Sequence, residues 1–142
     1  MSNSVHKNPY GPFWPLGSIA PTPGTPLNMM SNVDPTLVDA PETATGPTSK
    51  EYSVRAQQII IQGVKPNAGT GVTNNTGNIY VILKGGGSNN HQDYGAIAFV
   101  VGAGLTLSIG SAALNRNVFS PYELYIDCDT AGDAAQVTLL IQ

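Results

Sequence analysis

Residues 122–142 read YELYIDCDTAGDAAQVTLLIQ, and their pattern is repeated through most of the chain. Apolar side chains recur at every second position on both sides of the turn sequence DTAGDA: Leu124, Ile126, Cys128, Val137, Leu139 and Ile141. A period of two is that of a β-strand with one buried face. Gly132 can adopt a positive φ, so we expect DTAGDA to be a short hairpin connection between two strands.

Strand-like runs extend from this stretch back to residue 51. Four of them are rich in β-branched residues or alternate in polarity: SVRAQQIIIQGV (53–64), NIYVILK (78–84), AIAFVV (96–101) and LTLSIG (105–110). AIAFVV is apolar throughout and is predicted to be a buried strand. Stretches rich in Gly and Asn, such as KPNAGTGVTNNTG (65–77), predict turns. Residues 49–142 are therefore predicted to form an all-β domain, a small antiparallel β-sandwich that is jelly-roll-like.

The N-terminal third has a different composition. Nine of the eleven prolines precede residue 50: Pro9, Pro12, Pro15, Pro21, Pro23, Pro26, Pro35, Pro41 and Pro47. Proline fixes φ, removes a hydrogen-bond donor and favours extended geometry in the preceding residue. We therefore expect residues 1–48 to form an extended Pro-rich N-terminal arm with little regular structure. Within it, NMMSNVDPTLVDA (28–40) has the features of a short helical turn, with Asp34 as its cap and Pro35 at its first position.

The arm contains an apolar segment, GPFWPLGSIAPTPGTPLNM (11–29), which includes the single tryptophan and no charged residue. We expect the side chains of this segment to be buried, either against another protein or against an open edge of its own domain. Aromatic and methionine side chains are enriched at the centres of protein interfaces. The anchors that we expect to bind a partner are Phe13, Trp14, Leu16, Ile19, Leu27, Met29 and Met30.

Composition narrows the classes of function. Only 11% of the residues are charged, against about 25% in an average soluble domain. Surfaces with so little charge are typical of proteins that associate. The net charge of −3 and the scattering of the six basic residues argue against a nucleic-acid partner. No apolar run is long enough for a membrane-spanning helix, so no membrane partner is expected.

Catalytic and metal sites are not expected. Asp127, Asp129 and Asp133 in DCDTAGD are weak candidates for metal binding, because their spacing is similar to the opening of a calcium-binding loop. The remaining ligand positions of such a loop are not filled, so the favoured interpretation is an acidic strand face followed by a turn. His91 and Asp93 lie in a Gly/Asn-rich loop with no marked nucleophile beside them. We therefore predict a non-enzymatic protein without a cofactor.

Two smaller features remain. Cys128 is the only cysteine and falls in phase with Leu124 and Ile126, which predicts a buried thiol rather than a reactive one. Exposed tyrosines could form a surface for a glycan or a protein partner, and the candidates are Tyr80, Tyr94, Tyr122 and Tyr125.

The order of features in residues 51–142 resembles small β-sandwich virion proteins of tailed bacteriophages. The elements that carry the resemblance are SVRAQQIIIQGV, NTGNIYV, AIAFVVGAGLTLSIG and SPYELYIDCDTAGDAAQVTLLI. Residues 1–48 lie outside it. The resemblance implies a structural role in the virion, and it transfers no catalytic residue.

On this resemblance, the expected function is that of a capsid decoration or cement protein on the capsid surface, assembled in the host cytoplasm. Its partners would be the major capsid protein and neighbouring copies of itself, with a homotrimer suggested by the symmetry of a shell. The alternative is a receptor- or glycan-binding module of a phage fibre or tail.

Overall fold

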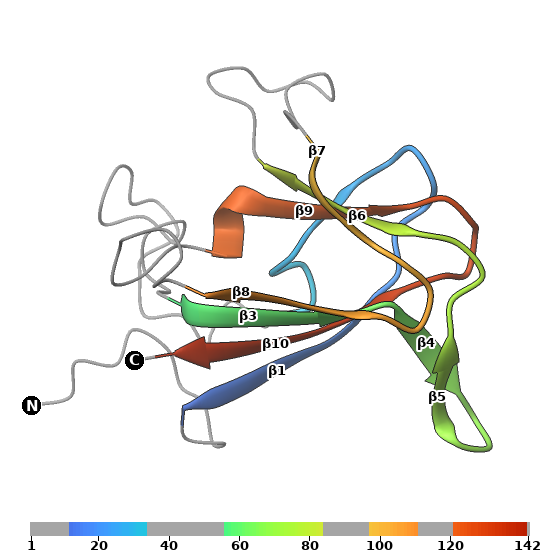
Figure 1. Ribbon diagram of the computed structural model, residues 1–142, viewed down its shortest axis with the longest axis horizontal. Coiled ribbons are helices and arrows are strands. Elements are labelled where there is room, and N and C mark those ends of the chain that lie inside the picture. Colours follow the sequence, from blue (N-terminus) through green and yellow to red (C-terminus); the bar gives the residue numbers. More distant parts are fainter. Residues whose placement is uncertain (1–11, 34–55, 84–96, 111–120, 142) are drawn as a thin grey trace, which may run out of the picture.

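The computed structural model describes residues 12–33, 56–83, 97–110 and 121–141, and within them the fold is all-β (Figure 1). Two four-stranded antiparallel sheets pack as a sandwich. Sheet I contains, in spatial order, β1 (Phe13–Ile19), β10 (Ala135–Ile141), β3 (Ala56–Gln62) and β8 (Thr106–Gly110). Sheet II contains β2 (Leu27–Asn28), β9 (Leu124–Cys128), β6 (Ile79–Leu83) and β7 (Ile97–Val101). The predicted β-sandwich is confirmed.

The strand order is that of a jelly roll. If the separate hairpin of β4 (Val64–Asn67) and β5 (Gly71–Asn74) is left aside, eight strands remain. The first pairs with the last, the second with the seventh, the third with the sixth, and the two middle strands with each other. The chain therefore folds back on itself like a long hairpin, and its strand pairs form the two facing sheets of a jelly roll.

The connection DTAGDA is not a hairpin, and that part of the sequence interpretation is wrong. β9 and β10 lie in different sheets, so DTAGDA crosses from sheet II to sheet I. Gly132 does adopt the expected positive φ, 91°. The crossing allows Cys128 and Ala135 to point into the same core from opposite layers, since both residues are buried.

The core lies between the sheets and is built from the alternating positions that the sequence predicts. β10 lies inside sheet I, with β1 on one side and β3 on the other. Its buried residues Val137 and Leu139 share this core with Ile59 and Ile61 of β3. Sheet II contributes residues with the same periodicity, Ile79, Val81 and Ile126. Full burial of each such side chain contributes about 1.5–3 kcal/mol.

The N-terminal segment is part of this sandwich, which corrects the predicted division at residue 48. β1 pairs with β10 from Phe13 opposite Leu140 to Ile19 opposite Ala135. β2 pairs with β9 in the other sheet. Residues 12–33 are therefore not a separate arm. Residues 1–11 and 34–48, including the predicted helical turn at Asp34, lie outside the described residues.

Proline is compatible with β1 because β1 is an edge strand. Pro15 lies where the register with β10 shifts, between Pro15 and Gly17, and Gly17 has a φ of 80°. At a bulge on an edge strand, a missing N–H removes no necessary ladder bond. The proline-rich composition thus marks an irregular edge rather than an unstructured arm.

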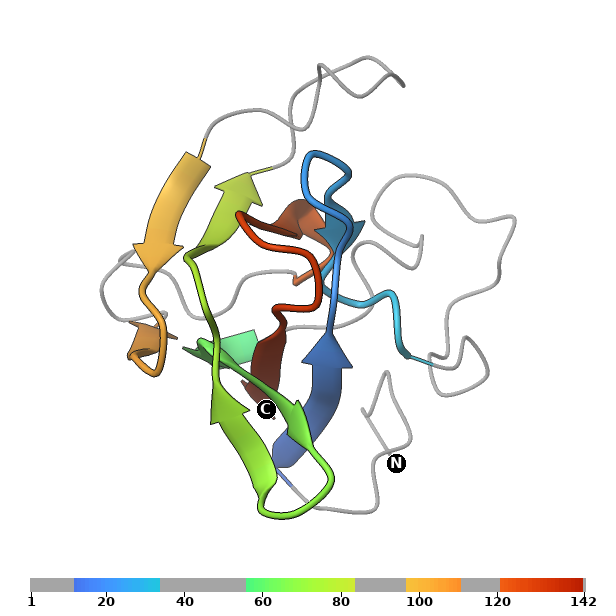
Figure 2. The same cartoon turned by 90° about the vertical axis from the view of Figure 1, so that its right-hand side faces the viewer.

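A two-stranded hairpin projects from the sandwich, and a buried carboxylate fixes its base (Figure 2). β4 and β5 pair from Val64 opposite Asn74 to Asn67 opposite Gly71, within a stretch that was predicted to be a turn. The fully buried Asp133 accepts hydrogen bonds from the backbone N–H groups of Thr76 (2.9 Å) and Gly77 (2.7 Å). It also forms an ion pair with Lys65 of β4 at 3.1 Å. The crossover from β9 to β10 is thereby joined to the hairpin.

Burial alone would raise the pKa of Asp133. The hydrogen bonds from Thr76 and Gly77 and the ammonium group of Lys65 outweigh this effect and hold the pKa below its ordinary value of 3.8. The folded protein therefore binds a proton at Asp133 less readily than the unfolded chain does. This contribution to stability is present at neutral pH and is lost as the pH falls through the folded-state pKa.

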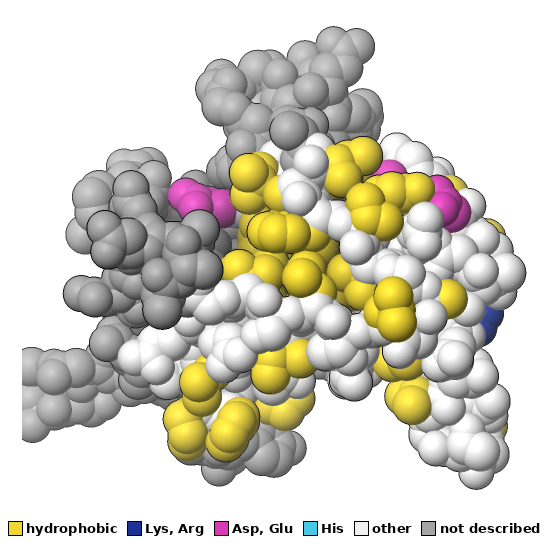
Figure 3. Space-filling view, viewed as in Figure 1, with side chains coloured by type: hydrophobic (Ala, Val, Ile, Leu, Met, Phe, Trp, Pro, Cys, Tyr) yellow, Lys and Arg dark blue, Asp and Glu magenta, His cyan; other side chains and the backbone are white. Residues whose placement is uncertain are grey.

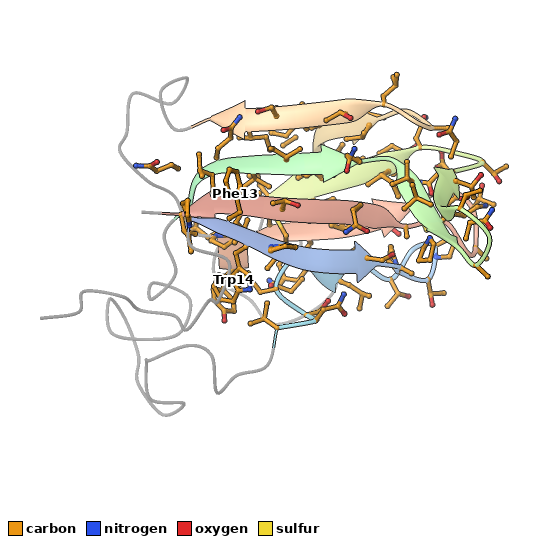
Figure 4. The ribbon with its side chains drawn as sticks, turned by 90° about the horizontal axis from the view of Figure 1, so that it is seen from below. Phe13 and Trp14 are labelled. Carbon is orange, nitrogen blue, oxygen red and sulfur yellow. The ribbon has the colours of Figure 1, made fainter. Side chains whose placement is uncertain are left out.

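Neighbouring residues of β1 provide a test of the corrected boundary (Figure 4). Trp14 is 5% exposed and Phe13 is 54% exposed. We expect Trp14→Ala to reduce the free energy of unfolding by about 3–5 kcal/mol, and Phe13→Ala to reduce it by about 0.5 kcal/mol or less. Urea denaturation followed by circular dichroism measures both values. Unchanged stability in Trp14→Ala would mean that Trp14 does not belong to this core.

The buried carboxylate predicts a specific pH dependence. At pH 7, Asp133→Asn should lower the free energy of unfolding by about 1–3 kcal/mol, because the ion pair and its charge-assisted hydrogen bonds are lost. The difference from the wild type should shrink as the pH falls below about 4. Urea denaturation between pH 7 and pH 2 measures it, with the exposed Glu123→Gln as the control for loss of one negative charge. A difference that stays constant over this range would contradict the assignment.

Candidate interaction surface

Sheet I and sheet II end on the same side of the molecule, at β8 and β7, the orange strands opposite the blue β1 in Figure 2. Large apolar side chains are exposed there, and hydrophobic atoms gather over these elements in the space-filling view (Figure 3). We call this surface the apolar edge and define it by Ile97, Phe99, Val100 and Leu105. Their exposed fractions lie between 37% for Phe99 and 62% for Leu105. These values are high for side chains of this size in a domain with an extensive core.

The register of β7 explains why both of its faces are exposed. Phe99 lies opposite the buried Val81 and therefore faces the interior side of the sheet. It remains partly exposed because β7 is the last strand of sheet II among the described residues. Val100 lies opposite Tyr80 and faces outward. The strand thus presents apolar side chains on both sides of its free edge.

The turn that presents Leu105 is fixed by backbone contacts to Gly63. The N–H of Gly63 donates to the Leu105 carbonyl oxygen (2.9 Å), and the N–H of Gly104 donates to the Gly63 carbonyl oxygen (2.8 Å). A Cβ atom at Gly63 would lie 2.5 Å from the carbonyl oxygen of Gly102, so only glycine fits this approach. The exposure of Leu105 is therefore a property of an ordered turn.

The described strands and turn that form the apolar edge contain no charged residue. No Asp, Glu, Lys or Arg occurs between Asp93 and Arg116. Natural edge strands usually carry charged side chains, proline or a covering segment that prevents pairing with another chain. The sequence interpretation assigned AIAFVV to a buried strand, and this is corrected by the exposure of Ile97, Phe99 and Val100. The absence of charge was the signal in the sequence that could have identified the surface.

The predicted partner anchors lie mostly in the protein's own core. Five of the seven are buried there: Trp14, Leu16, Ile19, Met29 and Met30. Leu27 is partly buried and packs against the same cluster. Phe13 alone among the seven is largely exposed. Of the two interpretations of this apolar segment, the structure supports the one in which the domain covers the segment itself.

Two of the candidate tyrosines share the outer face of sheet II. Tyr80 lies opposite Asp127 and Tyr125 lies opposite Ile82 on the adjacent strand, so the two rings are diagonal neighbours. The hydroxyl of Tyr80 donates to Asp129 Oδ1 (2.8 Å), and this hydrogen bond raises the pKa of Tyr80. The structure thus brings together two aromatic rings and two carboxylates.

The other two tyrosines do not belong to this group. Tyr122 lies in the short 3₁₀ turn η5 (Pro121–Glu123), packs against the core, and has a pKa raised by burial. Tyr94 lies outside the described residues, as do His91 and Asp93.

The three aspartates proposed as weak metal ligands have separate partners. Asp127 Oδ1 accepts a hydrogen bond from the N–H of Gly24 (3.1 Å), and Asp129 is bound by Tyr80. Asp133 is buried against Lys65. In the part of the chain that the structure describes, no group of three or more His, Cys, Asp or Glu side chains could hold a metal ion.

Cys128 occupies the buried position that the alternation predicts. Its thiol donates to the carbonyl oxygen of Pro21 (3.4 Å). Burial raises the pKa of the thiol, which disfavours the nucleophilic thiolate. Across residues 12–33, 56–83, 97–110 and 121–141, no helix is long and apolar enough to cross a membrane.

Comparisons with known proteins do not assign a family. No protein-family model matches the chain, and the searches of curated proteins and of solved structures give no match either. The jelly-roll assignment therefore rests on the strand order itself, and the apolar edge is the surface from which a function is argued.

Proposed function

We propose that this protein is a non-enzymatic structural protein of a bacteriophage virion, and within that class a capsid decoration or cement protein. The observation that carries the proposal is the apolar edge, an ordered and charge-free surface on a jelly-roll domain. Burial of such a surface against another protein releases water from apolar groups and is favourable. Jelly rolls occur in viral capsid proteins and also in lectins, so the fold alone does not decide between these functions.

Shell stabilisation would follow from preferential binding. A protein that binds the assembled lattice but not the dispersed subunits shifts the equilibrium toward the lattice. Many copies on one shell multiply a modest contact through high effective concentration. In this proposal the partners are the major capsid protein and neighbouring copies, with a trimer as the form that shell symmetry suggests. The contacts come from the apolar edge and Phe13, because the other predicted anchors are buried or packed against the core.

A second candidate function is glycan or receptor binding by a fibre or tail module. The observation that favours it is the diagonal pair of Tyr80 and Tyr125 beside Asp127. Aromatic rings with adjacent carboxylates provide both stacking surfaces and hydrogen-bond acceptors.

Co-sedimentation with capsid shells tests the first function. Purified protein is mixed with shells assembled from the major capsid protein of the same genome, and the bound fraction is measured. We expect the wild type to bind, and Leu105→Lys to bind at least about tenfold more weakly, a loss of ~1.4 kcal/mol. Val72→Lys is the matched control, because Val72 is 47% exposed on strand β5 and is not one of the residues of the apolar edge. A wild type that leaves the shells unoccupied would contradict the proposal.

Glycan binding is tested separately by a glycan array and by titration calorimetry with any hit. If the outer face of sheet II binds a sugar, Tyr125→Ala should weaken that binding at least about tenfold. Tyr122→Phe keeps the packed ring and serves as the control. Absence of any glycan hit, or equal binding by Tyr125→Ala, rules this candidate out.

A further inference from the structure

We propose that the apolar edge pairs with the same edge of a second copy of this chain, with β7 of one copy antiparallel to β7 of the other about a two-fold axis. The two copies of sheet II would then form one continuous sheet of eight strands. This inference rests on the proposed function for its biological role. It deepens that function by naming the contact between neighbouring copies, and it specifies a two-fold dimer in place of the trimer that shell symmetry suggests.

β7 has a free edge for this pairing, and its ladder with β6 shifts register once, between Phe99 and Ile97. Within the described residues, β7 forms a ladder with β6 on one side only. A terminal strand leaves a row of N–H and C=O groups that can pair with another strand. Two identical strands related by a two-fold axis are antiparallel, and such an interface uses the same patch on both copies.

The side chains identify β7, rather than β8, as the pairing strand. The outward residues of β8 are Thr106 and Ser108, which are polar and exposed. The exposed residues of β7 are all apolar: Ile97, Phe99 and Val100. Because they lie on both faces of the strand, pairing would bury apolar area above and below the joined sheet.

Charge favours a second copy over a charged partner. β7 contains no charged residue, and burying a partner's unpaired charge against Ile97 and Phe99 would cost desolvation energy. Identical strands that meet across a two-fold axis usually place like charges near each other, which is destabilising. β7 has no charge to bring to the axis. The other edge strand of sheet II, β2, is only two residues long and offers a much shorter edge.

Sedimentation velocity of the full chain over a range of concentrations tests the pairing. We expect a monomer–dimer equilibrium in the wild type, and at least about a tenfold increase in the dimer dissociation constant in Val100→Lys. Val100 is more than half exposed, so this substitution leaves the core intact. Val72→Lys on the hairpin should dimerise like the wild type. Urea denaturation of each variant confirms that it is folded.

Disulfide cross-linking of variants with one introduced cysteine locates the contact between the two copies of β7. Ile97→Cys, Ala98→Cys, Phe99→Cys and Val100→Cys are oxidised in separate samples, and at least one should form a disulfide-linked dimer because a two-fold axis brings one position close to its own copy. Val72→Cys should give none. The native Cys128 is buried and common to all samples.

Three results would overturn the pairing. The first is a wild type that stays monomeric at all concentrations, and the second is a wild-type oligomer that persists unchanged in Val100→Lys. The third is a monomer that Val100→Lys destabilises as strongly as a core substitution, since the edge would then be covered by the chain itself. A monomer that still binds shells contradicts the pairing alone, whereas a dimer that fails to bind shells contradicts the proposed function alone.

Discussion

The ladder between the first and the last strand, β1 and β10, is the interaction on which the rest of the structure depends. It joins residues near the two ends of the described chain, from Phe13 opposite Leu140 to Ile19 opposite Ala135. Closure of such a long segment costs conformational entropy, and burial of Trp14, Leu16 and Ile19 offsets that cost. Once β1 is paired, β2 is carried to sheet II beside β9, and the remaining strands complete the jelly roll.

The same closure explains why the two sides of the sandwich differ. On the side of β1 and β2, Pro15 and the bulge before Gly17 make the edge irregular and unsuited to further pairing. On the side of β7 and β8, the edge is free of charge and proline, and Gly63 holds the turn before β8 in place. The ladder of β7 with β6 also shifts register once, so the two edges differ in proline rather than in regularity. This asymmetry is the physical basis for proposing that the protein associates through the apolar edge.

Strand positions were predictable from sequence, because alternation reports directly on burial. The six runs recognised by period or composition correspond to β3, β6, β7, β8, β9 and β10. β1 was missed because proline argues against a strand unless the strand is known to lie at an edge, which is a tertiary property. The sequence indicates that the apolar anchors are buried, but it does not indicate which surface buries them. A core and a protein interface are both rich in the same apolar side chains, so composition does not distinguish the two. The exposure of Phe99 could not be predicted from the sequence either, because Phe99 lies on the inner face of its strand, where core residues lie.

Hydrogen–deuterium exchange as a function of protein concentration tests the central claim, that the apolar edge is covered by association, most directly. Exchange is followed by mass spectrometry for peptides that cover β7 and, as an internal reference, for the hairpin strand β5. The account predicts that amides of β7 become more protected as concentration rises, while those of β5 do not change. Exchange in β7 that is independent of concentration, or protection that rises equally in β5, would contradict it.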